Sequence, residues 1–198
     1  MYHLGAITHI MNKTVQLETD AFSAGQIESK IWAAEELERV AAHTHNLRIT
    51  ILGGWYGLLH FILKARGQQM IEWCRSYDLD PMACSTANVV NNTWESKEWA
   101  FKSYPKDANT VKYDDETNCV INTSTEHFDS QEWFNNISKG MLCVLQGNNL
   151  IIEDHVNRPE SLEHFKSMFP LETILFTGEK YFDFKENSYT RYMIIGHK

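Results

Sequence analysis

The stretch RITILGGWYGLL, residues 48–59, decides the expected fold. Residues 48–52 form a β-branched, apolar run typical of a buried strand, and residues 58–64 have a helix-like pattern. The glycines between them let a ligand approach the backbone, beside the polarised N–H groups of a helix N-terminus. The alternative is that these glycines only make an ordinary turn. A strand that enters a helix through glycines is the first half of a βαβ unit.

The alternation of strands and helices continues along the chain. A helix over 23–42 begins with a capping box, with Ser23 as N-cap and Gln26 at the third helical position. Further strands are predicted within 70–77, 98–104, 119–124 and 141–145, and further helices over 81–92, 130–139 and 161–168. Two apolar runs at 173–176 and 189–195 have no helix between them, which predicts an antiparallel hairpin. The sequence therefore predicts an α/β sandwich.

Length and composition exclude several classes of protein. A chain of 198 residues, with 43% hydrophobic and 22% charged residues, is typical of a single globular domain. The net charge of −8 argues against a broad duplex-binding surface. Neither a membrane span nor a signal peptide is evident, so no membrane partner is expected. The cysteines lack C-x-x-C spacing and are interpreted as small buried residues in a reducing, cytoplasmic compartment.

An acidic residue follows the glycine turn at a spacing typical of nucleoside sites. Asp78 lies 21 residues after Gly57, where a carboxylate can accept hydrogen bonds from ribose hydroxyls. Asp80 directly precedes Pro81 and is the better N-cap for the next helix, which leaves Asp78 for a ligand. The alternative is that Asp78 is only a turn or capping residue. A nicotinamide cofactor is disfavoured because the turn lacks a clean G-x-G-x-x-G.

The order of these motifs resembles that of the class I S-adenosylmethionine-dependent methyltransferases. Residues 49–59 are similar to their glycine-rich first motif, and 78–81 (DLDP) to their acidic second motif. Residues 106–108 (KDA), 118–127 (NCVINTSTEH) and 140–146 (GMLCVLQ) resemble the adenine-side element, the fourth strand with its Glu-His, and the fifth strand. The resemblance covers about 48–198. It implies a Rossmann-like three-layer sandwich, with a mostly parallel seven-stranded sheet and an antiparallel last strand.

The resemblance also implies one domain over 1–198, in which 1–47 forms an N-terminal helical cover over the core. The expected cofactor contacts come from the glycine turn, the acidic motifs, the fourth strand and the cover: Gly53, Gly54, Trp55, Tyr56, Gly57, Asp78, Leu79, Asp107, Ala108, Thr123, Gln26, Ser29 and Lys30. The last three share one helical face and can reach the cofactor carboxylate, unless that face is solvated. The bulk of Trp55 and Tyr56 departs from the family pattern and would pack on the cofactor or narrow the pocket.

Glu126 and His127 are the predicted catalytic residues, beside the methyl donor at the end of the fourth strand. His127 can remove a proton from the acceptor. The alternative is that Glu126 caps the following segment and His127 packs on it. The family's Asp/Asn-Pro-Pro-Tyr/Phe motif is missing here, which disfavours base amines and glutamine side chains as acceptors.

A polar stretch after the fifth strand lies on the same side of the predicted sheet, where ligands of open α/β sheets bind. It contains residues 146–149, Glu153, His155 and Asn157. No metal site is predicted, because Glu126, His127, Glu153 and His155 lack a ligand spacing. The other histidines singled out are assigned to helix surfaces: His43, His45, His60 and His164.

The predicted function is methyl transfer from S-adenosylmethionine to a small molecule, or to a short exposed group of a larger acceptor. Nucleic acid is the less favoured partner, because no run of basic residues interleaves with aromatics. Two alternatives stay open. One is another reaction of the same cofactor, either aminocarboxypropyl transfer or cleavage. The other is a non-catalytic S-adenosylmethionine-binding module.

Overall fold

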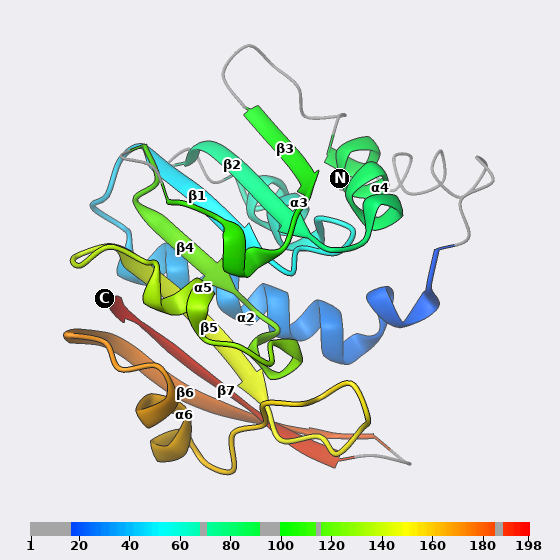
Figure 1. Ribbon diagram of the computed structural model, residues 1–198, viewed down its shortest axis with the longest axis vertical. Helices are drawn as coiled ribbons and strands as arrows, with labels where there is room; N and C mark the ends of the chain where they lie inside the picture. Colours follow the sequence, from blue (N-terminus) through cyan, green and yellow to red (C-terminus); the bar gives the residue numbers. More distant parts are fainter. Residues whose placement is uncertain (1–16, 68–70, 92–99, 114–115, 185–187) are drawn as a thin grey trace.

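A seven-stranded sheet, in the order β3-β2-β1-β4-β5-β7-β6, forms the centre of the molecule (Figure 1). The computed structural model describes residues 17–67, 71–91, 100–113, 116–184 and 188–198. The strands are β1 (Leu47–Leu52), β2 (Ile71–Asp78), β3 (Ala100–Pro105), β4 (Cys119–Asn122), β5 (Leu142–Asn148), β6 (Thr173–Asp183) and β7 (Ser188–His197). Strands β1 to β5 pair in parallel, and β7 is antiparallel to both β5 and β6. The predicted mostly parallel sheet with an antiparallel last strand is confirmed.

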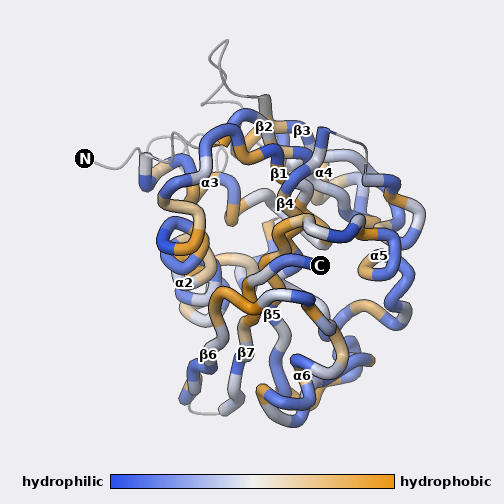
Figure 2. The backbone as a smooth tube through the Cα atoms, turned by 90° about the vertical axis from the view of Figure 1, so that its left-hand side faces the viewer, coloured by the Kyte–Doolittle hydropathy of each residue, from blue (hydrophilic) through white to orange (hydrophobic). Residues whose placement is uncertain are grey.

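Helices cover both faces of the sheet, which gives three layers (Figure 1). One face carries α2 (Ala24–Val40), α3 (Leu58–Ala65) and α4 (Pro81–Asn91), and the other carries α5 (Glu132–Asn135) and α6 (Leu162–Met168). Short 3-10 turns are η1 (Thr19–Phe22), η3 (Ala108–Thr110) and η4 (Thr125–His127). Figure 2 shows the hydrophobic central strands between the two helical layers. This is the predicted α/β sandwich.

The helix α2 begins where its capping signal predicts. The Ser23 side chain accepts a hydrogen bond from the backbone N–H of Gln26, 3.4 Å away, which satisfies one unpaired donor of the first turn. Farther along, Trp32 and Leu37 are buried in the core on this face of the sheet, and the Trp32 ring packs edge-to-face on Phe176 of β6. Residues 1–16 of the predicted cover lie outside the described residues.

The opposite core is rich in aromatic rings. Trp133, Phe134, Phe165 and Phe169 are fully buried there and pack edge-to-face or tilted against one another. The helix predicted over 130–139 is shorter than expected, because α5 ends at Asn135. Asn136 and later polar residues of this segment favour turns, since their side chains compete for backbone hydrogen bonds. Burial of two large rings, not helix propensity, therefore determines the place of α5.

His60 corrects one expectation from the sequence. It is only 1% exposed, and its Nδ1 lies 2.8 Å from Oδ1 of Asn91 in α4. Leu58, Leu59 and Leu63 of the same short helix are buried with it, so His60 lies on the face of α3 that packs on the core. His43 and His45 lie in an exposed loop after α2 rather than on a helix, whereas His164 is exposed on α6. All four cysteines are buried and free, as predicted.

The carboxyl ends of the parallel strands point toward one edge of the sheet. Strands β1 and β4 are neighbours at its centre, and the chain leaves them toward opposite sides of the sheet. Ligands of open α/β sheets bind at such a switch point. Within the described residues, no helix is both long and apolar enough to cross a membrane.

Candidate functional site

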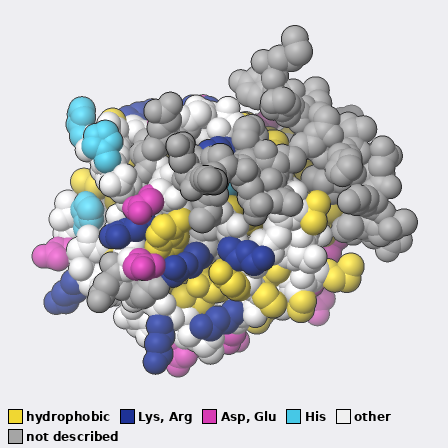
Figure 3. All heavy atoms as spheres, turned by 90° about the horizontal axis from the view of Figure 1, so that it is seen from above, with side chains coloured by type: hydrophobic (Ala, Val, Ile, Leu, Met, Phe, Trp, Pro, Cys, Tyr) yellow, Lys and Arg dark blue, Asp and Glu magenta, His cyan; other side chains and the backbone are white. Residues whose placement is uncertain are grey.

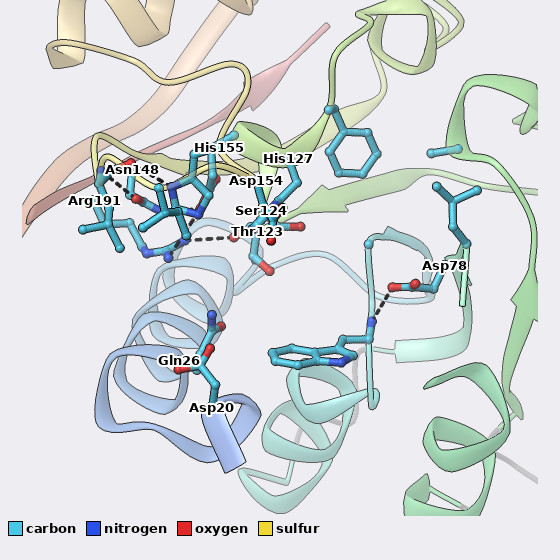
Figure 4. A pocket seen from close by; sticks show the side chains of 18 of the residues that line it. Asp20, Gln26, Asp78, Thr123, Ser124, His127, Asn148, Asp154, His155 and Arg191 are labelled. Atoms are coloured by element: carbon cyan, nitrogen blue, oxygen red, sulfur yellow. Dashed lines mark hydrogen bonds and ion pairs between the residues drawn. The ribbon is translucent and has the colours of Figure 1, made fainter. Parts of the chain in front are cut away.

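A pocket of about 900 Å³ lies at this edge of the sheet. Its wall combines residues that follow β1, β2, β4 and β5 with residues of α2 and of the β6–β7 hairpin. Figure 4 shows Asp78 on one side of the pocket, with Asn148, His155 and Arg191 on the opposite side. The two sides are called here the carboxylate end and the polar end. Between them, the labelled Thr123 and Ser124 follow β4, and His127 lies next to His155 at the polar end.

The glycine turn forms part of the carboxylate end. Gly53 has a φ of 61°, and a Cβ atom there would lie 2.7 Å from Oγ of Ser124, so no larger residue fits without movement. Trp55, two residues farther along the same turn, also has a positive φ of 46°. A bulky residue in this region is strained by about 1–3 kcal/mol and needs support from its surroundings.

Asp78 provides that support. Its Oδ2 accepts a hydrogen bond from the backbone N–H of Trp55 at 2.8 Å, and its Oδ1 accepts one from Asp80 at 3.1 Å. Asp80 in turn accepts from the backbone N–H of Met82 at 2.8 Å, in the first turn of α4. The predicted division of labour, in which Asp80 caps the helix and Asp78 faces the pocket, agrees with this geometry.

The remaining predicted residues of the carboxylate end line the pocket less closely. Asp107 and Ala108 both contribute to its wall. The Asp107 side chain accepts a hydrogen bond from the backbone N–H of Asn109 at 2.9 Å, so it also caps η3. Leu79 contributes to the wall although it is largely exposed.

Four predicted cofactor residues do not line the pocket. Tyr56 is buried and its ring stacks on Phe22, away from the cavity. Gly54 faces Ser76, whose Oγ would overlap a Cβ at that position. The other two have structural contacts: Gly57 has a positive φ and accepts a hydrogen bond from Asn91, and Ser29 donates one to the carbonyl oxygen of Gln26. These residues shape the turn and the helix that form the wall.

Two residues of α2 reach the pocket as the sequence predicts. Gln26 and Lys30 both line it, and Nζ of Lys30 lies 2.6 Å from Oε1 of Gln26. Burial, together with the nearby Arg191 guanidinium, lowers the pKa of Lys30 to about 7. Lys30 is therefore a cation whose charge is sensitive to what occupies the pocket.

Glu126 and Arg191 form a buried ion pair at the polar end. Their side chains are 2% and 4% exposed, and NH2 of Arg191 lies 3.6 Å from Oε1 of Glu126. The amide of Asn148 donates a hydrogen bond to the same oxygen, and Arg191 also donates one to the carbonyl oxygen of Thr123 at 2.9 Å. Burial raises the pKa of Glu126, while the Arg191 guanidinium opposes that shift.

Two histidines lie beside this ion pair. Their rings are 4.6 Å apart and nearly perpendicular, with His127 exposed and His155 buried. Nδ1 of His155 is 2.9 Å from the carbonyl oxygen of Leu150, and the backbone of Asp154 lies near the His127 ring. Burial lowers the pKa of both imidazoles, which favours their neutral forms. The pocket wall therefore offers nitrogen lone pairs at this point.

The sequence did not identify Arg191 as a site residue. Its one signal is a charged residue inside the apolar run YTRYMIIG of β7, where burial requires a partner. Asn148 and His155 belong to the polar stretch that the sequence places at this edge, whereas Glu153 of that stretch is exposed and does not line the pocket. Asp20, Phe184 and Tyr189 also line the pocket, from η1 and from the β6–β7 hairpin.

Solved structures resemble this arrangement, although no protein-family profile and no curated protein matches the sequence. Magnesium protoporphyrin IX methyltransferase from Synechocystis, solved with bound S-adenosylmethionine, superposes with a TM-score of 0.62 at 12% identity. The match covers 96% of this chain and 89% of that one. The chain has the fold of the class I S-adenosylmethionine-dependent methyltransferases.

Two other structures agree with this fold. Phosphoethanolamine N-methyltransferase 2 from Haemonchus contortus, in complex with S-adenosylmethionine, has a TM-score of 0.59 at 9% identity, over 96% of this chain and 60% of that one. The YcgJ protein of Bacillus subtilis has a TM-score of 0.63 at 10% identity, over 84% and 98% of the two chains. The Rossmann-like methyltransferase fold implied by the sequence motifs is thereby confirmed.

Proposed function

We propose that this protein transfers a methyl group from S-adenosylmethionine to a small molecule, or to a short exposed group of a larger acceptor. The observation that carries the proposal is one pocket with two chemically different ends. Asp78 and the glycine turn form one end, and the buried Glu126–Arg191 pair forms the other. A transferase needs this arrangement because it must hold two substrates in contact and in line.

The cofactor would occupy the carboxylate end. Its ribose hydroxyls would share the carboxylate of Asp78 with the backbone N–H groups that already bind it. The adenine would extend toward Asp107 and Ala108, and the amino acid part toward Gln26 and α2. Support comes from the fold, since two of the similar structures hold S-adenosylmethionine.

The acceptor would occupy the polar end. The sulfonium methyl group is already activated, so the protein has mainly to orient the nucleophile and to accept a proton where one is released. His127 lines the pocket, and its lowered pKa favours the neutral ring that a proton acceptor requires. Its role as a base is part of the proposal.

A small acceptor agrees with the size and charge of the site. A cavity of about 900 Å³ is within the range of small-molecule sites. The cofactor and a small acceptor together would fill most of this cavity. The pocket lining carries more acidic than basic side chains, and on the described part of the face drawn in Figure 3 the Lys and Arg side chains lie among hydrophobic ones with acidic ones beside them. Duplex DNA instead requires several basic contacts along its backbone.

The test begins with the cofactor and then identifies the reaction. Calorimetric titration with S-adenosylmethionine should show one site per chain. Incubation with the cofactor and fractionated cell extract should yield S-adenosylhomocysteine by mass spectrometry. Methylthioadenosine would instead indicate aminocarboxypropyl transfer or cleavage, and binding without turnover in any fraction would indicate a binding module. Absence of binding would contradict the proposal.

A further inference from the structure

Three side chains at the polar end converge on one point. One donor atom from each of Glu126, His127 and His155 lies within 4.8 Å of the other two. All three residues line the pocket, and Figure 4 shows His127 and His155 next to each other beside Asp154. Two of them, Glu126 and His127, are adjacent in the sequence, and His155 comes from the loop after β5.

The histidine rings are oriented by the backbone. A carbonyl oxygen only accepts hydrogen bonds, so the contact of 2.9 Å with Leu150 places the proton of His155 on Nδ1 and leaves Nε2 with its lone pair. The backbone of Asp154 lies near the His127 ring and raises its pKa, against the lowering by burial. Metal-binding histidines usually have this outer support, in which one ring nitrogen donates to a carbonyl and the other is the ligand.

The carboxylate of Glu126 has one oxygen to spare. Its Oε1 accepts from Asn148 and faces Arg191, whereas its Oε2 is buried without a hydrogen-bond partner among the described residues. The residue as a whole is 1% exposed. A buried carboxylate oxygen left unpaired costs free energy, so a ligand that binds it would remove this penalty.

We propose that Glu126, His127 and His155 bind a divalent transition-metal ion at the polar end of the pocket. Two imidazoles and one carboxylate are the protein ligands of a class of catalytic zinc sites and of non-haem iron(II) sites. Both kinds of site keep open positions for water or substrate. The exposed side of His127 faces the pocket and leaves room for such positions.

The geometry requires a modest adjustment. Neighbouring ligands of a four-coordinate zinc ion lie about 3.4 Å apart, so donors separated by up to 4.8 Å must move closer together. His127 can make most of this movement because its side chain is exposed. Arg191 reduces the attraction for a cation, but its contact is with Oε1, and the buried Oε2 stays without a hydrogen-bond partner among the described residues. A structural ion pair with no metal is therefore the competing explanation to be tested.

The metal site has a consequence for the acceptor, and this consequence alone rests on the proposed function. A bound divalent ion lowers the pKa of a coordinated hydroxyl or thiol. The acceptor would then present an oxygen or sulfur atom to the metal and lose its proton to solvent, while His127 would act as a ligand instead of a free base. That atom would form a bond to the methyl carbon as the bond from this carbon to the sulfonium breaks, and S-adenosylhomocysteine would leave. The acceptor class favoured by this site is thus a hydroxyl- or thiol-bearing small molecule.

The experiment uses the untagged full chain, treated with a chelator and then exposed separately to Zn²⁺, Mn²⁺ and, without oxygen, Fe²⁺. After gel filtration, bound metal is quantified by plasma mass spectrometry, and Co²⁺ absorption reports the ligand geometry. We expect one equivalent of at least one ion. His127→Ala and His155→Ala should each weaken binding by at least about 10-fold. His164→Ala, which removes an exposed histidine of α6, is the matched control and should bind as the unmodified chain does.

Two results would overturn the metal site. One is a chain that retains no ion, and the other is unchanged binding in folded His127→Ala and His155→Ala variants, with folding checked by circular dichroism. Titration of the same samples with S-adenosylmethionine separates the two proposals. Metal retention without cofactor binding supports the metal site and contradicts the methyltransferase. Cofactor binding without metal retention supports the methyltransferase and contradicts the metal site.

Discussion

The two ends of the pocket are assembled from the chain in different ways. The carboxylate end comes from a short turn after β1 and from Asp78 at the end of β2, and these two strands are consecutive in the chain and neighbours in the sheet. The polar end joins Lys30, Glu126, Asn148, His155 and Arg191, which come from five separate segments. Local sequence determines the first end, whereas only the complete fold assembles the second.

The largest expected effect is on the polar end. Arg191→Met removes one partner of a buried ion pair and leaves Glu126 uncompensated, which should lower the free energy of unfolding by about 3–5 kcal/mol. Urea unfolding followed by circular dichroism measures this loss. The double variant Arg191→Met/Glu126→Gln removes both charges and should recover part of it. A single variant as stable as the unmodified chain would show that the polar end contributes no more to folding than a surface pair.

The second effect concerns the support beneath the glycine turn and depends on pH. Burial lowers the pKa of His60 from 6.5 to about 4, and His60 contacts Asn91, which donates a hydrogen bond to the carbonyl oxygen of Gly57. Between these pH values the unfolded chain binds a proton that the folded chain does not. The free energy of unfolding should therefore fall by up to about 3 kcal/mol as the pH decreases from 6.5 to 4, with no further loss from this group below that range.

The His60 contribution is isolated by difference. His60→Gln removes the titrating group, so the gap in unfolding free energy between the two proteins should change with pH in the same window. Effects of other acidic groups cancel in this difference. A gap that is constant from pH 7 to 4 would contradict the assignment to His60.

A smaller effect tests the carboxylate end directly. Asp78→Ala should weaken the binding of S-adenosylmethionine by about 1–3 kcal/mol, which is the range for a lost hydrogen bond to a charged group. This corresponds to roughly 5- to 150-fold in Kd by calorimetry. Arg191→Met, if folded, should change cofactor affinity much less, because it acts at the opposite end. Equal losses of cofactor affinity in the two variants would mean that the cofactor contacts both ends of the pocket.

The smallest effect separates Asp78 from its neighbour. Asp80→Ala removes the cap that accepts from Met82 and should lower the free energy of unfolding by about 1 kcal/mol. Cofactor affinity should stay as it is in the unmodified chain, since Asp80 does not line the pocket. A loss of affinity in Asp80→Ala, with stability unchanged, would reverse the roles assigned to the two carboxylates.

The same contrast explains what sequence reasoning predicts and what it misses. The patterns that indicate β1, the glycine turn, α3 and Asp78 each lie within a short stretch of sequence. These features are therefore predictable from the sequence alone. Arg191 carries only the signal of a charge inside an apolar run, and its role depends on the pairing of β7 with β5, which places it opposite Asn148, 43 residues earlier in the chain. His60 is missed for the same reason: its helix is short, and the packing of α4 against it, which buries His60 beside Asn91, is not visible in the local sequence.

The residues of the glycine turn show the same limit of prediction from sequence. Lining residues such as Gly53 and Trp55 follow from the motif, but the motif does not say which side of the turn faces the cavity. Gly54 and Tyr56 therefore look equivalent to their neighbours in sequence although they point away. Which members of a motif touch a ligand is decided by backbone dihedral angles, and these depend on the packing around the turn.

The left-handed conformation of Trp55 makes this residue an optical reporter. Its backbone is held by the same Asp78 oxygen that a ribose hydroxyl would approach, so a ligand that competes for this oxygen changes the restraint on the turn. The indole lines the pocket and stacks on Tyr56 at 5.2 Å between ring centroids, and any release of the turn alters its surroundings. Comparison of intrinsic fluorescence between the unmodified chain and Trp55→Phe would then follow arrival at the carboxylate end in real time, without a label and without knowledge of the acceptor.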